Sequence, residues 1–161
     1  TPQPIPTTPN PPTFQTYQNQ SEGIKIEYPQ DWNLREILDP ITKEVVEILS
    51  PNYEASLLIT VEPLPQPISL DEYSSEQTQN IKQFAAPPYK MNTQEYTLAK
   101  RRAFMVTYEA NESGKIVKRM EVWALKNQKA YVVTYQAETG LYSKFLPTVE
   151  TMINSLEIID N

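Results

Sequence analysis

The sequence predicts an α+β domain: a mainly antiparallel, twisted β-sheet with helices packed on it. Three observations predict this class. Short segments rich in Val, Ile and Tyr recur along the chain, and several alternate apolar and polar residues as half-buried strands do. Two segments have helical spacing instead, one in the middle of the chain and one near its end. Turn residues connect the late strands over short distances, which is typical of antiparallel hairpins.

The chain opens with a segment that we expect to be an extended linker. Residues 1–12 hold six of the fifteen prolines, and proline fixes φ and removes a backbone donor. No basic residue orients this segment as an SH3 or WW ligand, so we interpret it as a spacer. Because the first residue is Thr1, we expect a processed product or a piece of a longer chain, with an anchor, a membrane segment or another domain upstream. Residues 13–161 are then the folded domain.

Four strands are expected before the first helix. The segment 24–28 alternates apolar and polar residues and is stopped by Pro29, while the segment 56–61 carries apolar residues toward both faces, which predicts a central position. Trp32 follows the second strand, and we expect it to close one end of the core. The four expected strands are 14–17, 24–28, 45–49 and 56–61.

The first helix is signalled by Ser69 and Glu72, which match the N-cap and N3 positions of a capping box. We expect this helix to run to about Phe84, ahead of two consecutive prolines. From Tyr96 onward, the chain is expected to form an antiparallel meander with turns at 111–114 and 126–129. The three strands expected in this meander are 103–108, 116–125 and 130–135.

The second helix is expected after Gly140, and residues 156–159 are expected to close as a short final strand. Its apolar face recurs at i, i+4, i+7, i+8 and i+11 from Phe145. Aromatic side chains on the strands could line a ligand groove, but such side chains more often pack in a core; the groove candidates are Trp123, Tyr131 and Tyr135. The residues assigned to the structural core are Tyr28, Trp32, Trp123 and Phe145.

Composition narrows the chemistry of the chain. It has no His, no Cys and three Gly, which removes imidazole bases, thiolate nucleophiles, disulfides, the usual zinc sites and Gly-rich phosphate loops. The net charge of −6 argues against general nucleic-acid binding and against a basic membrane-binding face. No apolar run approaches the roughly 20 residues of a membrane span. We therefore expect a non-catalytic binding domain without a cofactor.

Carboxylates provide one candidate site. Glu109, Glu112 and Glu121 have the ligand type for acid–base or Ca²⁺ chemistry. Two of them flank a hairpin turn, however, and the spacing of an EF-hand loop is absent. We interpret the three carboxylates as structural, with the two at the turn solvated, and expect no Ca²⁺ or other metal.

Basic residues provide the other candidate site. A dense cluster precedes one strand of the meander, and more basic residues follow on the next strand, with Lys115 nearby. The cluster would serve either as a charged edge that blocks aggregation between strands or as a docking patch for an acidic partner. The residues of this candidate docking patch are Lys100, Arg101, Arg102, Lys118 and Arg119.

The segment from Gly23 to Trp32, GIKIEYPQDW, resembles the G-x-x-[FI]-x-Y-P-x-x-W opening of PsbP-like domains. Later segments resemble further motifs of that family in the same order, so the resemblance covers residues 14–159. It implies an α/β/α sandwich around a mainly antiparallel sheet. The later matching segments are 45–51, 58–62, 70–73, 121–135 and 144–158.

The resemblance also implies a class of function. The family includes extrinsic subunits on the lumenal side of photosystem II, and cyanobacterial members occur alone or as the C-terminal domain of serine/threonine kinases. Metal sites of plant members use a His, which this chain lacks, so calcium and chloride retention is not expected.

Three hypotheses follow. In the first, the chain is a monomeric accessory domain in the thylakoid lumen or periplasm that is tethered through an upstream segment. It binds a protein partner, does not bind nucleic acid and does not itself insert into a membrane. In the second, it is the regulatory or substrate-recruiting domain of a larger kinase, which also allows a cytoplasmic location. In the third, it is a small carboxylate-based hydrolase or Ca²⁺-binding module.

Overall fold

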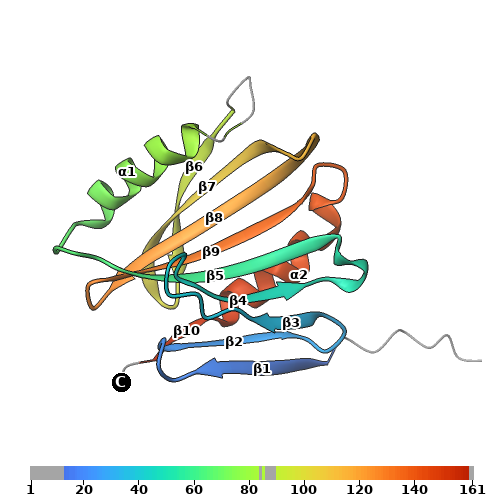
Figure 1. Cartoon of the computed structure of the whole chain (residues 1–161), viewed down its shortest axis with the longest axis horizontal. Coiled ribbons are helices and arrows are strands. Elements are labelled where there is room, and N and C mark those ends of the chain that lie inside the picture. Colours follow the sequence, from blue (N-terminus) through green and yellow to red (C-terminus); the bar gives the residue numbers. More distant parts are fainter. Residues whose placement is uncertain (1–12, 84, 86–89, 160–161) are drawn as a thin grey trace, which may run out of the picture.

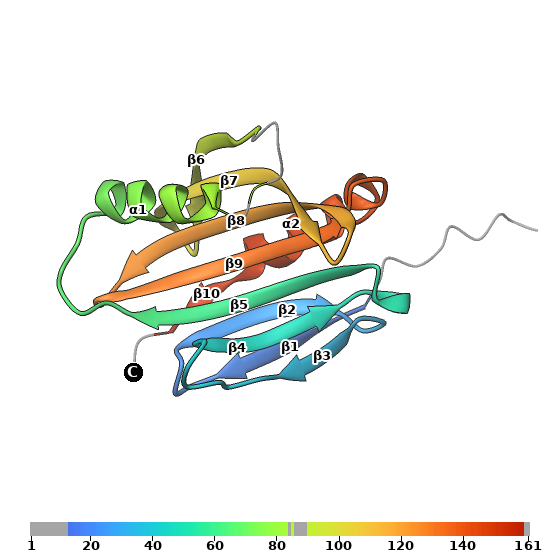
Figure 2. The same cartoon turned by 45° about the horizontal axis from the view of Figure 1, so that its top comes forward.

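The computed structural model describes residues 13–83, 85 and 90–159 and has the predicted α+β class. Its strands form two antiparallel sheets, and helices α1 and α2 lie on opposite faces of the large sheet (Figures 1 and 2). The large sheet has seven strands in the order β3-β4-β5-β9-β8-β7-β6, and the small sheet has three in the order β1-β2-β10. The expected linker over 1–12 and the expected helix end at Phe84 lie outside the described residues.

The elements in the first half of the chain are β1 (Phe14–Asn19), β2 (Ile24–Pro29), β3 (Asn33–Glu36), β4 (Glu44–Leu49), a 3₁₀ turn (Pro51–Tyr53), β5 (Ala55–Pro63) and α1 (Leu70–Lys82). Those in the second half are β6 (Asn92–Leu98), β7 (Arg101–Glu112), β8 (Lys115–Lys126), β9 (Lys129–Glu138), α2 (Tyr142–Ser155) and β10 (Glu157–Ile158). Strand β5 lies between β4 and β9, which confirms its predicted central position.

Two strands, β3 and β6, were not predicted from the sequence. They are the two edge strands of the large sheet, and most of their residues are exposed. A strand with a neighbour on one side and little buried surface lacks the alternation of apolar and polar residues from which strands are predicted. The expected three-stranded meander is therefore a four-stranded one, because β6 pairs with β7.

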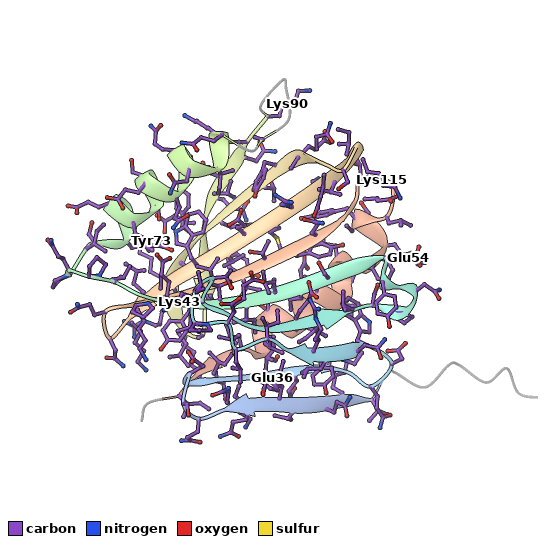
Figure 3. All side chains as sticks on the ribbon, in the orientation of Figure 1. Glu36, Lys43, Glu54, Tyr73, Lys90 and Lys115 are labelled. Carbon is purple, nitrogen blue, oxygen red and sulfur yellow. The ribbon has the colours of Figure 1, made fainter. Side chains whose placement is uncertain are left out.

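Helix α1 begins at the predicted capping box. The Oγ atom of Ser69 accepts a hydrogen bond from the backbone N–H of Glu72 at 3.1 Å. Tyr73 points from this helix toward the sheet (Figure 3) and meets the ring of Trp123 edge-on, with 6.1 Å between the ring centroids. The buried Ser74 accepts a hydrogen bond from the indole N–H of Trp123 at 2.8 Å. These contacts hold α1 over the end of the sheet that contains β7 and β8.

Helix α2 lies on the opposite face of the large sheet and also contacts the small sheet through β2. Its predicted apolar face is buried: Val149, Met152 and Ile153 are at most 1% exposed. Phe145, at the start of this face, packs edge-on against Trp32 with a centroid distance of 5.9 Å. Trp32 thus lies in the core, as predicted, whereas Tyr28 is only half-buried at the margin of the core.

The end of the chain is attached to the small sheet at a position that requires glycine. Gly23 has a φ of +75°, and a Cβ atom placed there would lie 2.9 Å from the carbonyl oxygen of Ile159. The backbone N–H of Ile159 in turn donates to the carbonyl of Gly23 at 2.7 Å. This close approach joins β10 to β2 and completes the small sheet.

Candidate protein-docking face

The α1 side of the large sheet is covered over only part of its width. Helix α1 contacts β7, and Figure 1 shows β9, β5 and β4 without a helix in front of them, while α2 lies behind. Alternate residues of these three strands face this side and are half-buried. We call this surface the open face; its residues are Glu47, Leu49, Ser56, Leu58, Thr60, Val132, Thr134 and Gln136.

A polar network borders the open face where the sheet passes toward α1. The guanidinium of Arg119 donates to the side-chain oxygen of Gln136 at 2.6 Å and pairs with Glu112 at 3.2 Å. The hydroxyl of Tyr108 donates to the carboxylate of Glu121. Glu121 is directly opposite Thr134 in the register of β8 and β9, so the network is continuous with the open face. The two together line a shallow hollow of about 300 Å³.

Burial changes the acidity of two groups in this network. Burial raises the pKa of the Glu121 carboxyl above its ordinary value, although the Tyr108 hydrogen bond and the charge of Arg119 partly offset the effect. The pKa of the Tyr108 hydroxyl is also raised, first by burial and then by the negative charge of Glu121. A half-buried carboxylate that accepts a hydrogen bond from a phenol, with a guanidinium charge nearby, is a polar anchor suited to recognising a complementary surface.

A Glu121→Gln variant is expected to gain stability relative to the wild type as the pH rises. Because the folded-state pKa of Glu121 is raised, the native state binds more protons than the unfolded state between the ordinary and the raised value. The carboxyl therefore lowers stability as the pH rises through that window, whereas Gln stays neutral and still offers Tyr108 an acceptor. Urea unfolding at pH 4 and pH 8 measures the effect. A stability difference between variant and wild type that is equal at both pH values would contradict the prediction.

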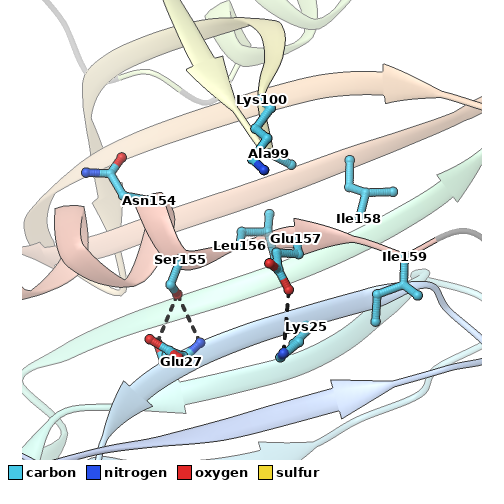
Figure 4. Close-up of a pocket in the computed structure, with 10 residues that line it drawn as sticks. All are labelled: Lys25, Glu27, Ala99, Lys100, Asn154, Ser155, Leu156, Glu157, Ile158 and Ile159. Carbon is cyan, nitrogen blue, oxygen red and sulfur yellow. Dashed lines mark hydrogen bonds and ion pairs between the residues drawn. The ribbon is translucent and has the colours of Figure 1, made fainter.

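A second hollow, of about 490 Å³, lies between β10, β2 and the turn that joins β6 to β7 (Figure 4). Within it, Lys25 pairs with Glu157 at 3.6 Å. The Oγ atom of Ser155 accepts a hydrogen bond from the backbone N–H of Glu27 at 2.9 Å and donates to the carbonyl of Met152 at 2.6 Å. This serine therefore links the end of α2 to β2, and the hollow is a structural junction.

The residues of the candidate docking patch do not lie together. Arg102 pairs with Asp71 at the start of α1 and with Glu95 on β6, both at 2.8 Å. Lys118 and Arg119 are adjacent on β8 and point to opposite faces of the sheet, because successive strand residues alternate. The amine of Lys118 lies 4.6 Å from the centroid of the Tyr142 ring on the α2 side, and Arg119 belongs to the network on the α1 side.

The two remaining basic residues of that patch lie at the turn between β6 and β7. Arg101 donates through Nε to the backbone carbonyl of Leu125 at 3.0 Å. Lys100 is exposed and lines the hollow beside β10. Lys118 on β8 lies opposite Glu109 on β7. Arg102 and Glu109 are seven positions apart along β7, so Arg102 and Lys118 are separated by about 23 Å at roughly 3.3 Å per residue. The five residues therefore do not form one patch.

The other sequence candidates separate in the same way. Glu109 is exposed on β7, whereas Glu112 and Glu121 belong to the polar network. Trp123, Tyr131 and Tyr135 are all buried, so they lie in the core of the described structure and not on its surface. Among the residues that the structure describes, no group of His, Cys, Asp or Glu side chains could hold a metal ion. None of the helices in the described part is long and apolar enough to cross a membrane.

The family of the chain follows from a match over most of its length. The family model described as PsbP-like protein matches residues 7–158. The chain belongs to the PsbP-like family. The expectation drawn from the Gly23–Trp32 segment is thereby confirmed. No curated protein sequence matches this PsbP-like chain.

Solved structures share the fold at low sequence identity. The PsbP-like chain is similar to cyanobacterial PsbP (CyanoP) from Synechocystis sp. PCC 6803, with a TM-score of 0.67 and 9% identity over 96% of this chain and 98% of that one. It is also similar to the Saccharomyces cerevisiae Ran-binding protein Mog1p, with a TM-score of 0.60 and 10% identity over 93% and 97% of the two chains. LpqN, involved in cell envelope biogenesis of Mycobacterium tuberculosis, has a TM-score of 0.62 and 13% identity over 94% and 87%.

Sequence reasoning did not find the open face of this PsbP-like chain. Its residues are spread over three strands that are distant in sequence, and no local motif marks them. One signal was present: Leu57, Leu58 and Ile59 are consecutive apolar residues in β5, so at least one of them faces away from the α2 core. The register identifies it as Leu58, at the centre of the open face between Glu47 and Thr134.

Proposed function

We propose that this PsbP-like chain is a non-catalytic accessory domain that docks a protein partner on the open face. The observation that carries the proposal is the uneven cover of the large sheet: α2 lies on one face, while α1 leaves β4, β5 and β9 uncovered on the other. The uncovered residues mix apolar side chains with hydrogen-bonding ones, as the surfaces of non-obligate protein complexes do. Leu58 and Val132 are the apolar centre, and the Arg119 network is the polar rim.

The proposed partner surface is basic and has an apolar centre. Glu47, Glu112 and Glu121 line the hollow beside the open face, and Arg119 is the cation that lines it with them. The whole chain carries a net charge of −6, so long-range attraction also favours a basic partner. Such docking weakens as salt screens the charges.

The finer proposal is that this partner belongs to photosystem II and that the chain acts in the thylakoid lumen or periplasm. Its support is family membership together with the fold shared with cyanobacterial PsbP. The same open face would then rest on the lumenal surface of the complex. The docking mechanism requires no bond-making step by this chain.

Binding to isolated photosystem II core complexes, measured by co-sedimentation, tests both levels of the proposal. The Leu58→Arg variant places a cation at the centre of the open face and is expected to weaken binding at least tenfold, because hot spots lie at the centre of an interface. The matched control is Ile116→Arg on β8, because Ile116 is 42% exposed. Ile116 lies two positions from Lys118 and therefore faces the α2 side, away from the open face. This variant should leave binding unchanged.

The possible outcomes separate the two levels. If the wild type binds and the Leu58→Arg variant binds equally well, the open face is not the docking surface. No wild-type binding to the cores would overturn the photosystem II proposal. Equal losses in both variants would point to a general effect of added positive charge, which circular dichroism and a salt series would identify.

A further inference from the structure

Strand β1 is the free edge of the small sheet. It pairs along its whole length with β2, and within the described part of the chain no strand lies on its other side. Figure 1 shows β1 along the lower margin of the molecule. The side chains of Gln15, Thr16 and Gln18 are exposed. An unpaired strand edge presents a row of backbone donors and acceptors to any chain that can approach it.

Hydrogen bonds at the two ends of β1 show which backbone groups point outward. The carbonyl of Thr13 accepts from the N–H of Gln30 at 2.8 Å, and the carbonyl of Asn19 accepts from the N–H of Gly23 at 2.9 Å. Since strand residues direct their backbone groups to alternate edges, positions 13, 15, 17 and 19 bond toward β2. Positions 14, 16 and 18 therefore direct their N–H and C=O groups to the free edge.

The β1 edge lacks the features that keep other edge strands from pairing. Proteins protect free edges with charged residues, proline or very short strands. The sequence of β1 is FQTYQN, without charge, proline or glycine. In contrast, β3 carries Arg35 and Glu36, β6 carries Glu95, and β10 has two residues.

We infer that β1 is a self-association edge, at which two copies of this chain pair antiparallel about a two-fold axis at Thr16. In this register Thr16 lies opposite its own symmetry mate, and Phe14 lies opposite Gln18 of the second copy. All three outward-facing residues of each strand then exchange backbone hydrogen bonds, and the two small sheets become one continuous sheet. This surface is distinct from the open face and does not depend on the function proposed for it.

The absence of charge on β1 itself favours a second copy as the occupant of this edge. An uncharged strand that pairs with itself sets no like charges opposite each other, and threonine pairs across strands are favourable. A symmetric pair of β6 strands centred on Glu95 would instead oppose two carboxylates. Each copy carries a net charge of −6, so the pairing works against long-range repulsion. Added salt therefore strengthens it, whereas salt weakens docking of a basic partner on the open face.

Sedimentation equilibrium of the full chain, as a function of concentration and salt, tests the inference. The wild type is expected to form a dimer that tightens with salt. Thr16→Pro removes an outward-facing N–H and no bond to β2, so dimerisation should weaken at least tenfold while the monomer stays folded. Thr93→Pro on β6 is the matched control. Leu98 and Arg101 pair across a two-residue turn, so the backbone groups of Leu98 bond toward β7. Because these groups alternate along the strand, the N–H of Thr93 points away from β7, to the free edge of β6. This variant should leave the dimer intact.

Two further measurements keep the test independent of proline. Thr16→Glu is expected to abolish self-pairing, because two carboxylates then face each other beside Glu27 of each copy, which lies opposite position 16. Mixing Thr16→Glu with Thr16→Lys is expected to restore a dimer. Amide exchange should show protection at positions 14, 16 and 18 that rises with concentration.

Three outcomes would overturn the inference. The first is a wild type that remains at the 18.5 kDa mass of one chain at millimolar concentration. The second is a dimer that Thr93→Pro disrupts as strongly as Thr16→Pro. The third is a dimer in which the amides of β1 gain no protection, which would place the contact elsewhere.

Discussion

Replacing Trp123 with Ala is expected to lower the free energy of unfolding by about 3–5 kcal/mol. The side chain is fully buried between α1 and the large sheet. Its ring stacks on Phe104 with 5.6 Å between centroids, and its indole N–H donates to Ser74. Truncation leaves a cavity under α1 and a buried hydroxyl without its donor, and both effects destabilise the folded state.

Urea unfolding followed by circular dichroism measures this loss. Tyr53→Ala is the control, because that aromatic side chain is 68% exposed and its removal should change stability by less than about 0.5 kcal/mol. Amide exchange in α1 should also accelerate in the Trp123 variant, since the indole and Ser74 attach this helix. A loss below about 1 kcal/mol would show that α1 closes onto the sheet without the indole.

Replacing Trp32 with Ala is expected to cost a similar amount, about 3–5 kcal/mol, but in the other half of the core. Trp32 is 6% exposed and meets Phe145 with an interplanar angle of 84°. This contact joins the segment after β2 to the first turns of α2. Its loss therefore weakens the packing of the small sheet on α2, while the Ser155 hydrogen bond to β2 remains.

A double-mutant cycle with Phe145→Ala isolates the ring contact. We expect a coupling free energy of about 0.5–1.5 kcal/mol, the range for edge-to-face aromatic pairs. The control cycle combines Trp32→Ala with Val149→Ala on the same helix. Because valine has no ring, the coupling free energy in this cycle should be smaller. Equal coupling in the two cycles would assign the effect to general packing against α2.

The two tryptophans lie in separate hydrophobic clusters, one on each side of the large sheet. This division matters for function, because the two sides are covered differently. The α2 side is closed by the helix and the small sheet. On the α1 side, helix cover within the described residues lies where Trp123 holds α1, and the open face begins where that cover ends.

Local chemistry was sufficient to predict the central elements. The capping box at Ser69 predicted the start of α1, and the apolar spacing from Phe145 predicted the buried face of α2. Alternation predicted β2, and consecutive apolar residues predicted the central position of β5. These signals work because each reports the burial of a residue within its own element.

The open face and the free edge of β1 depend on contacts between distant residues. Leu58 faces Thr134 only because β5 pairs with β9, and β1 is an edge because, among the described residues, it pairs with β2 alone. The candidate docking patch shows the same dependence. Its basic residues are adjacent in sequence or on neighbouring strands, but Lys118 and Arg119 point to opposite faces of the sheet because strand residues alternate.

Composition and local periodicity predicted the class of the fold, the two helical faces and the chemistry that the chain lacks, while the resemblance of the Gly23–Trp32 segment and later motifs predicted the family. The half of the sheet that α1 leaves uncovered and the strands that lie at the edges could be read only from the folded chain. A local pattern shows whether a residue is buried, whereas the neighbour that buries it is chosen by packing across the whole chain.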